Sequence, residues 1–157
     1  MKLKSVYLFI LVILAQVYFP RIFIFNTTIT VDLILVLLTI YGLKYKRTYC
    51  IVIGFLCGLC QDMISQINLI GAFAMAKSIS GYALGTLNNF DKIWSKKIKY
   101  AYIFTIYIAH NSIYYYLKLF SLIELSSAIK LIFIQSFISL LLFELVNIFI
   151  YKRKLIK

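Results

Sequence analysis

Long apolar runs, separated by short polar segments, fill most of the chain. The six runs cover residues 5–19, 28–43, 48–64, 67–87, 100–117 and 130–151. A helix needs about 20 residues to cross the hydrocarbon core of a bilayer, with a working range of roughly 17–25. The last four runs reach this length, whereas the first two are short and either extend through residues 20–27, thin the bilayer locally or form a re-entrant hairpin. The pattern predicts an all-α membrane protein, a polytopic bundle of about six transmembrane helices.

Composition supports this prediction. Of the 157 residues, 63% are hydrophobic and only 14% are charged, whereas a soluble domain carries about 25% charged and under about 50% apolar residues. The longest connections, residues 88–99 and 118–129, are too short for a soluble domain. We therefore expect residues 1–157 to form a single integral membrane domain.

The basic residues predict the orientation of the bundle. There are 17 Lys and Arg against five Asp and Glu, a net charge of +12. With the N-terminus inside, 13 of the 17 cations fall on the cytoplasmic side: Lys2, Lys4, Lys44, Lys46, Arg47, Lys92, Lys96, Lys97, Lys99, Lys152, Arg153, Lys154 and Lys157. The positive-inside rule then places both termini in the cytoplasm. Because the cations lie between apolar runs, we expect them to bind anionic lipids and no nucleic acid.

Residues 1–15 have the charge and apolar run of a signal peptide. The candidate cleavage site, Ala15-Gln16-Val17, is not a small-x-small sequence. We therefore expect a retained first helix.

Few residues suggest an enzyme. Cys57 and Cys60 form a C-x-x-C pair, but a membrane redox relay needs a second pair and only Cys50 is left. His110 is the only histidine and has no neighbouring ligands in the sequence. No nucleophile elbow, phosphate-binding loop or paired-aspartate motif is present. We expect no enzymatic activity, no metal and no cofactor.

Charged residues inside the runs are more informative. Asp32, Asp62, Lys77 and Glu144 each cost several kcal/mol if they face lipid. Asp32 and Asp62 fall near the outer ends of their helices, and Asp62 is expected to anchor the turn between the third and fourth spans. A proton or ion relay is one interpretation. Pairing inside the protein, or with another membrane subunit, is favoured because Lys77 and Glu144 lie at different depths.

Small residues mark the third and fourth spans. They include Gly54-x-x-x-Gly58, Gly71 and Gly81-x-x-x-Gly85. Missing side chains let helix backbones approach closely, which holds helices together in lipid. We expect these spans to be packing helices, within the protein or against a partner.

Together these residues resemble the rod shape-determining protein MreD family, over residues 32–85. The matching segments are Gly54-Phe55-x-x-Gly58-Leu59-x-x-Asp62, Leu69-x-Gly71-x-x-Ala74 and Asp32-Leu33-Ile34-Leu35. The resemblance implies a non-enzymatic inner-membrane scaffold of the bacterial cell-elongation machinery, which builds lateral peptidoglycan. It implies as partners a single-span MreC-like protein, an MreB-like filament, and the elongation glycosyltransferase and transpeptidase. The partner or packing surface would include Asp32, Asp62, Lys77, Glu144 and the five glycines above.

The resemblance also leaves an alternative, because the family's bundle is similar to the substrate-binding subunits of energy-coupling-factor vitamin transporters. In that case, polar residues in the outer half would line a ligand pocket. They are Asn26, Thr27, Thr28, Asp32, Asp62, Gln66 and Asn68.

Overall fold

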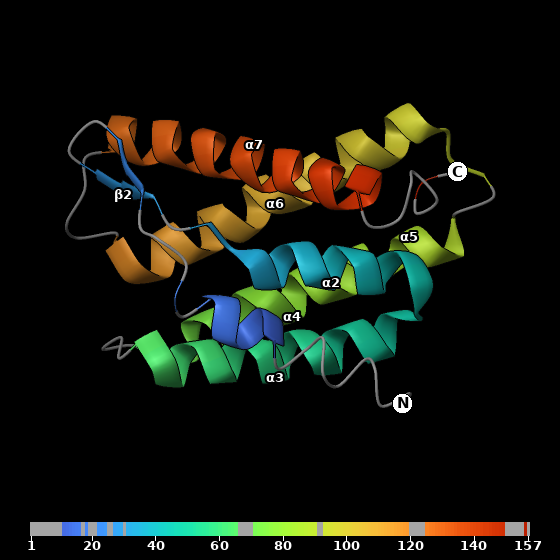
Figure 1. The fold of residues 1–157 in the computed structure, drawn as a ribbon, viewed down its shortest axis with the longest axis horizontal. Helices are drawn as coiled ribbons and strands as arrows, with labels where there is room; N and C mark the ends of the chain where they lie inside the picture. Colours follow the sequence, from blue (N-terminus) through green and yellow to red (C-terminus); the bar gives the residue numbers. More distant parts are fainter. Residues whose placement is uncertain are drawn as a thin grey trace.

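The computed structural model describes most of the chain, and in particular its helical part. The described residues are 11–16, 18, 22–24, 27–29, 31–65, 71–90, 93–119, 125–149 and 156. The elements are β1 (Ile22–Ile24), β2 (Thr27–Ile29), α2 (Leu33–Lys44), α3 (Arg47–Ser65), α4 (Ala72–Leu84), α5 (Thr86–Asn89), α6 (Lys96–Leu119) and α7 (Leu125–Phe149). Residues 11–16 are helical as well. The architecture is thus a helical bundle, as predicted (Figure 1).

The only strands in the described ranges form a small antiparallel pair before α2. Ile22 pairs with Ile29, and Ile24 pairs with Thr27. Ile, Phe and Thr, which favour strands, dominate this segment. The pair corrects the expected second run, residues 28–43, because its first residues belong to β2. The helix begins only at Leu33 and is 12 residues long, which is shorter than a full span.

Helix α2 is the central element of the bundle. Every residue from Ile34 to Leu43 is buried, and the helix contacts α3, α4, α5 and α7. A helix that is apolar on all sides is stable only when neighbours surround it. The core around it contains Leu35, Leu38, Leu84 and Phe143.

The fourth predicted span, residues 67–87, is also shorter than expected. Its helix α4 covers 13 residues and starts after Gly71, whose φ of 104° only glycine adopts freely. The helix ends at Leu84, and the four-residue helix α5 follows Gly85. Residues 66–70 lie outside the described residues. By contrast, α3, α6 and α7 cover the third, fifth and sixth predicted spans within a few residues.

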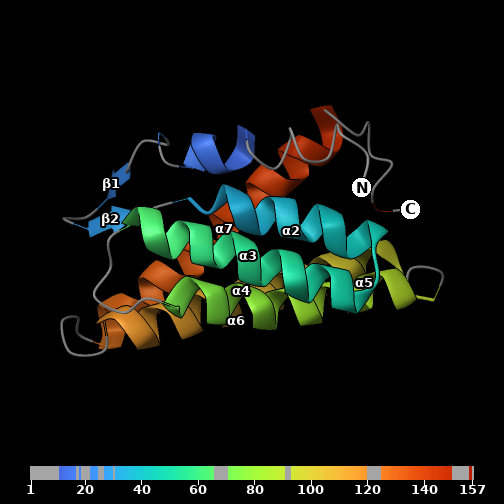
Figure 2. The same ribbon diagram turned by 90° about the horizontal axis from the view of Figure 1, so that it is seen from below.

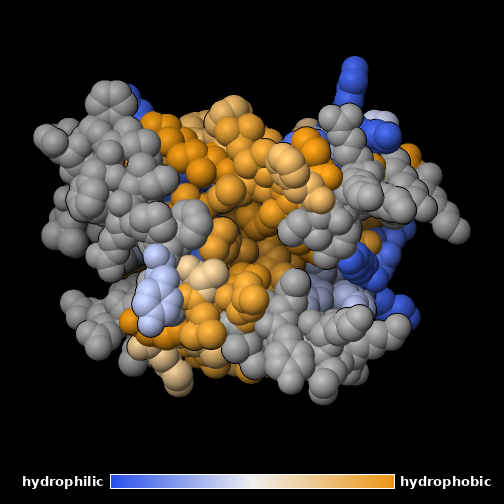
Figure 3. Space-filling view, viewed as in Figure 1, coloured by the Kyte–Doolittle hydropathy of each residue, from blue (hydrophilic) through white to orange (hydrophobic). Residues whose placement is uncertain are grey.

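Two of the described helices are long and apolar enough to cross a membrane. They are the segments Arg47–Ile64 of α3 and Ser126–Phe149 of α7. The outer surface of α7 carries large exposed apolar side chains at every fourth position: Ile129, Phe133, Phe137, Leu141, Leu145 and Phe149. The middle of the face in Figure 3 is correspondingly apolar. Polar side chains are instead buried in the interior, the arrangement expected of helices in lipid.

Successive long helices alternate in direction (Figure 2). The end of α2, the start of α3 and the start of α6 therefore share one end of the bundle. This end carries Lys44, Lys46, Arg47, Lys96 and Lys97. In the described helices, these five cations are thus gathered at one end of the bundle.

Candidate functional site

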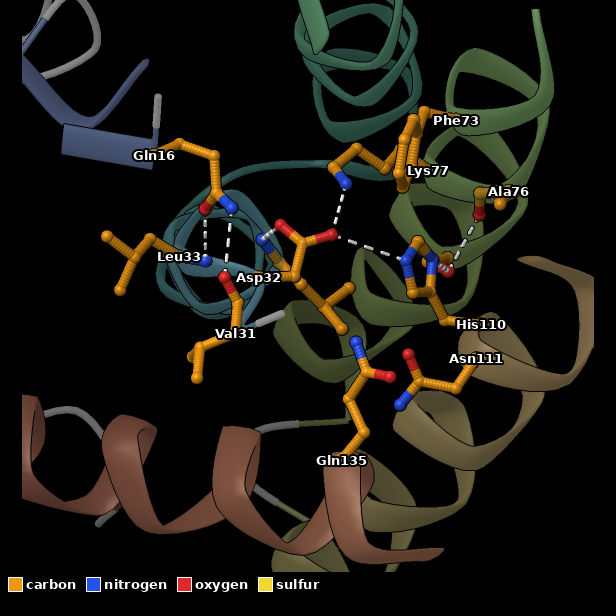
Figure 4. Close-up of polar contacts among 12 residues, drawn as sticks. Gln16, Val31, Asp32, Leu33, Phe73, Ala76, Lys77, His110, Asn111 and Gln135 are labelled. Carbon is orange, nitrogen blue, oxygen red and sulfur yellow. Dashed lines mark hydrogen bonds and ion pairs between the residues drawn. The ribbon is translucent and has the colours of Figure 1, made fainter. Parts of the chain in front are cut away.

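Three ionisable side chains from three helices meet in the interior of the bundle (Figure 4). They are Asp32 at the start of α2, Lys77 on α4 and His110 on α6, with exposed fractions of 6%, 0% and 2%. We call them the Asp32 cluster. In the sequence they are separated by 45 and 33 residues, so only the folded bundle brings them together.

Asp32 holds the cluster together. It is the N-cap of α2, and its Oδ1 accepts a hydrogen bond of 3.1 Å from the N–H of Leu35. Its Oδ2 forms an ion pair with the Lys77 ammonium. The Nε2 atom of His110 lies 3.4 Å from the same oxygen. One carboxylate therefore caps a helix and faces two basic groups, which agrees with the expected internal pairing of the charged residues.

The two basic groups have further contacts on α4. The Lys77 ammonium lies 4.9 Å from the centre of the Phe73 ring, a cation–π contact. The Nδ1 atom of His110 is 3.1 Å from the Ser80 hydroxyl oxygen. This hydroxyl donates in turn to the Ala76 carbonyl at 2.8 Å. Helix α4 thus positions both the lysine and the histidine.

The N-terminal helical segment covers the start of α2. Gln16 donates to the Val31 carbonyl at 2.9 Å and accepts from the N–H of Leu33 at 2.7 Å. This bidentate contact ties residues 11–16 to the turn that carries Asp32.

Hydrogen-bonded polar pairs continue from the cluster along α6 and α7. On the side away from the basic end, Asn111 donates to Ser136 at 2.9 Å. Further out, Tyr115 donates to Gln135 at 3.0 Å. Towards the basic end, the hydroxyls of Tyr107 and Thr39 are 2.8 Å apart. These side chains come from three helices, so the polar interior is shared across the bundle.

Glu144 belongs to a separate polar group. It accepts a hydrogen bond from Tyr100 and lies 3.5 Å from the side-chain amide of Asn147. Along α6, the fully buried Ile103 stands between Tyr100 and Tyr107. The structure therefore does not bring Glu144 to Lys77.

Asp62 anchors the turn between α3 and α4, as predicted. It is 1% exposed, and its carboxylate accepts from the backbone N–H groups of Gly71, Phe73 and Ala74 at 3.1, 3.1 and 3.0 Å. These groups lie at the start of α4, where N–H groups lack partners within the helix. Asp62 therefore acts as an N-terminal cap supplied by the preceding helix.

The predicted packing of the third and fourth spans is confirmed, and the contact is internal. A Cβ atom on Gly58 would lie 2.3 Å from the Cα of Ala74, and one on Gly54 would lie 2.4 Å from the carbonyl oxygen of Lys77. From the other side, a Cβ on Gly81 would approach the Cys50 oxygen to 2.5 Å, and one on Gly85 would approach the Cα of Arg47 to 2.6 Å. The glycine faces of α3 and α4 therefore pack against each other.

Sequence reasoning missed His110 as a member of a cluster. His110 has no neighbouring polar ligands in the sequence, and its partners Asp32 and Ser80 belong to other helices. Its position in the middle of an apolar span was the available signal, since a polar group there needs an internal partner. Cys50, Cys57 and Cys60 are free thiols on α3. The described ranges contain no group of three or more His, Cys, Asp or Glu suited to a metal ion.

No protein-family model, curated protein or solved structure matches this chain. Function must therefore be argued from the motif residues and their geometry.

Proposed function

We propose that this protein is a non-enzymatic scaffold subunit of the cell-elongation machinery in the bacterial cytoplasmic membrane. It would pack against a single-span MreC-like partner, with an MreB-like filament and the elongation glycosyltransferase and transpeptidase in the same assembly. Both termini and the basic end of the bundle would face the cytoplasm, where the cations contact anionic lipids.

One observation carries this proposal. Two of the three segments behind the MreD resemblance meet at one interface, since Gly54 and Gly58 contact α4 and Asp62 caps its start. The third segment contributes Asp32, which pairs with Lys77 on α4. The motif therefore builds a rigid helix pair. A rigid, lipid-embedded body with an apolar outer face suits a subunit that holds other membrane helices in place.

The transporter alternative has less support. Two aspartates of its expected pocket, Asp32 and Asp62, are already engaged in internal contacts. Thr27 and Thr28 lie in β2, and Asn26, Gln66 and Asn68 lie outside the described residues. A vitamin that stabilised the purified protein in a thermal-shift screen would favour this alternative.

The partner surface must differ from the one expected from the sequence. Because the glycine faces of α3 and α4 pack against each other, a partner helix needs another face. The exposed row on α7 that includes Phe133 and Phe137 is the best candidate, because α7 is a long apolar helix whose outer side is exposed among the described residues. A single transmembrane helix would lie along this row.

Site-specific crosslinking in the native host tests the proposal. A photo-crosslinking residue at Phe137 should capture an MreC-like protein, whereas one at the equally exposed Phe55 on α3 should capture much less. Depletion of the protein should turn rod-shaped cells into spheres. Capture of a transporter ATPase, or unchanged cell shape after depletion, would contradict the scaffold function.

A further inference from the structure

The Asp32 cluster has a property that a scaffold does not require. We propose that it is a proton-binding centre in which His110 takes up and releases one proton. The proposal goes beyond the scaffold function and does not depend on it. Ionisable side chains inside a membrane bundle commonly mark such sites.

The contacts of His110 fit two protonation states. In the neutral state, Nε2–H points to Asp32, and Nδ1 accepts from a Ser80 hydroxyl turned towards it. In the charged state, Nδ1 binds the added proton and donates to the Ser80 oxygen, while the Ser80 hydroxyl donates to Ala76. Histidine and serine can fill both roles. Uptake of one proton at Nδ1 therefore needs only the rotation of one hydroxyl.

The surrounding charges make the centre a single-proton site. Asp32 and Lys77 form an ion pair with no net charge, so the cluster changes between neutral and +1 when His110 is protonated. Among the residues that the structure describes, the other nearby titratable groups are Tyr107 on α6, bound to Thr39, and the buried Cys57 on α3. From α7, the described side chains near the cluster are uncharged: Gln135 (Figure 4), and Ser136, which is bonded to Asn111.

The packing on both sides of the cluster argues against a proton path through the bundle. Towards the outer ends of α6 and α7, beside the pairs Asn111–Ser136 and Tyr115–Gln135, the residues Phe73, Tyr114, Tyr115 and Leu131 form a second buried cluster. Towards the basic end, beyond Tyr107, the interior is closed by fully buried apolar residues: Leu84, Leu87, Ile103 and Phe143. Such packing holds no water that could carry a proton further. The geometry thus points to a binding centre and not to a path across the membrane.

His110 is the only histidine of the chain, so nitrogen-15 labelling of histidine reports on this centre alone. The full-length protein, purified in detergent micelles with a histidine-free tag, would be followed by NMR from about pH 4 to pH 8, a range that covers both exposed and buried histidines. We expect the two ring nitrogens to change from the neutral to the charged pattern while the rest of the spectrum stays folded.

Two variants test whether the named contacts control this proton. Ser80→Ala should change the proton affinity of His110 about fivefold, the effect of one hydrogen bond. Lys77→Met should raise it about tenfold or more, because a neighbouring positive charge is lost. Ser78→Ala is the matched control, since the Ser78 hydroxyl bonds only to Ala74 on its own helix.

Ring signals that stay constant over this range would overturn the proposal, as would a titration equal in Ser80→Ala and Ser78→Ala. If Lys77→Met does not fold, the comparison of His110 titration in Ser80→Ala and Ser78→Ala still tests the proposal. Proteoliposomes with an internal pH dye test whether the centre is part of a proton path across the membrane. We expect no more proton leakage than in empty vesicles, and protein-dependent leakage abolished by His110→Gln would replace the binding centre with a transmembrane path.

Discussion

The α3–α4 and α6–α7 pairs are both antiparallel, but they are held together by different means. Between α3 and α4, glycines bring the backbones into contact, with no room for a single Cβ atom at four positions. Between α6 and α7, polar side chains form hydrogen bonds from one helix to the other at three places: Tyr115–Gln135, Asn111–Ser136 and Tyr100–Glu144. The first interface depends on shape and the second on hydrogen bonds.

This difference follows from the physics of helices in lipid. Apolar side chains gain little by leaving lipid for a helix interface, so association relies on close packing and on hydrogen bonds. The α3–α4 pair uses the close approach that glycine permits. The α6–α7 pair uses polar groups that would be costly to leave in lipid. We therefore expect α3–α4 to fail when volume is added and α6–α7 to lose stability gradually when polar groups are removed.

The largest effect is expected from added volume at Gly58. In Gly58→Leu, the new side chain meets the Ala74 backbone, which cannot move as a flexible side chain can. We expect a loss of at least about 3 kcal/mol in the free energy of unfolding. Unfolding in mild detergent, followed by the fluorescence of the single tryptophan, Trp94, would measure it. Phe55→Leu, on the exposed side of α3, is the control and should unfold like wild type. Equal stability of both variants would show that the glycine contact is not needed.

The second effect concerns the cap that closes the α3–α4 pair. Asp62→Ala leaves three backbone N–H groups without their acceptor: those of Phe73 and Ala74, which are buried, and that of Gly71, which is partly buried. We expect the free energy of unfolding to fall by about 2–3 kcal/mol. Asp62→Asn keeps one acceptor oxygen and should lose less. The same unfolding measurement compares the two variants. If Asp62→Ala and Asp62→Asn lowered the free energy of unfolding by the same small amount, water or another group would be capping α4 in place of Asp62.

The α3–α4 pair could be predicted from the sequence because its determinants are local. The glycine spacing and the position of Asp62 lie within one helical hairpin, in which neighbours in the chain are neighbours in space. The gathering of Lys44, Lys46, Arg47, Lys96 and Lys97 at one end of the bundle was also predictable, since it depends on the order of charges along the chain.

The Asp32 cluster could not be predicted in the same way. Its members come from α2, α4 and α6, and their contact depends on where each helix begins. The sequence did not show that α2 starts only at Leu33, after a strand pair, which places Asp32 deep enough to meet Lys77. It also did not show that α4 is short. Where a helix begins and ends in the bundle depends on packing against distant segments, and the length of an apolar run does not show this.

A smaller effect is expected from the α6–α7 interface. Tyr115→Phe removes the hydroxyl that donates to Gln135 but keeps the ring. We expect a loss of about 1 kcal/mol. A double-mutant cycle with Gln135→Leu isolates the bond between the two side chains, and we expect a coupling of about 0.6 kcal/mol. No coupling between the two changes would mean that side-chain hydrogen bonds do not hold this pair together.

The smallest effect is expected at Ser139 on α7, and its sign is opposite. Ser139 is 1% exposed, and its hydroxyl has no hydrogen-bond partner in the part of the chain that the structure describes. Ser139→Ala removes a buried hydroxyl that forms no hydrogen bond in the described structure. The free energy of unfolding should therefore rise by about 0.5 kcal/mol. Ser136→Ala, one turn away, is the matched control and should lower stability by about 1 kcal/mol, because Asn111 loses its acceptor. If both variants were destabilised alike, Ser139 would also take part in the hydrogen bonds of this interface. Opposite signs would show instead that a polar side chain stabilises α6–α7 only where it has a partner.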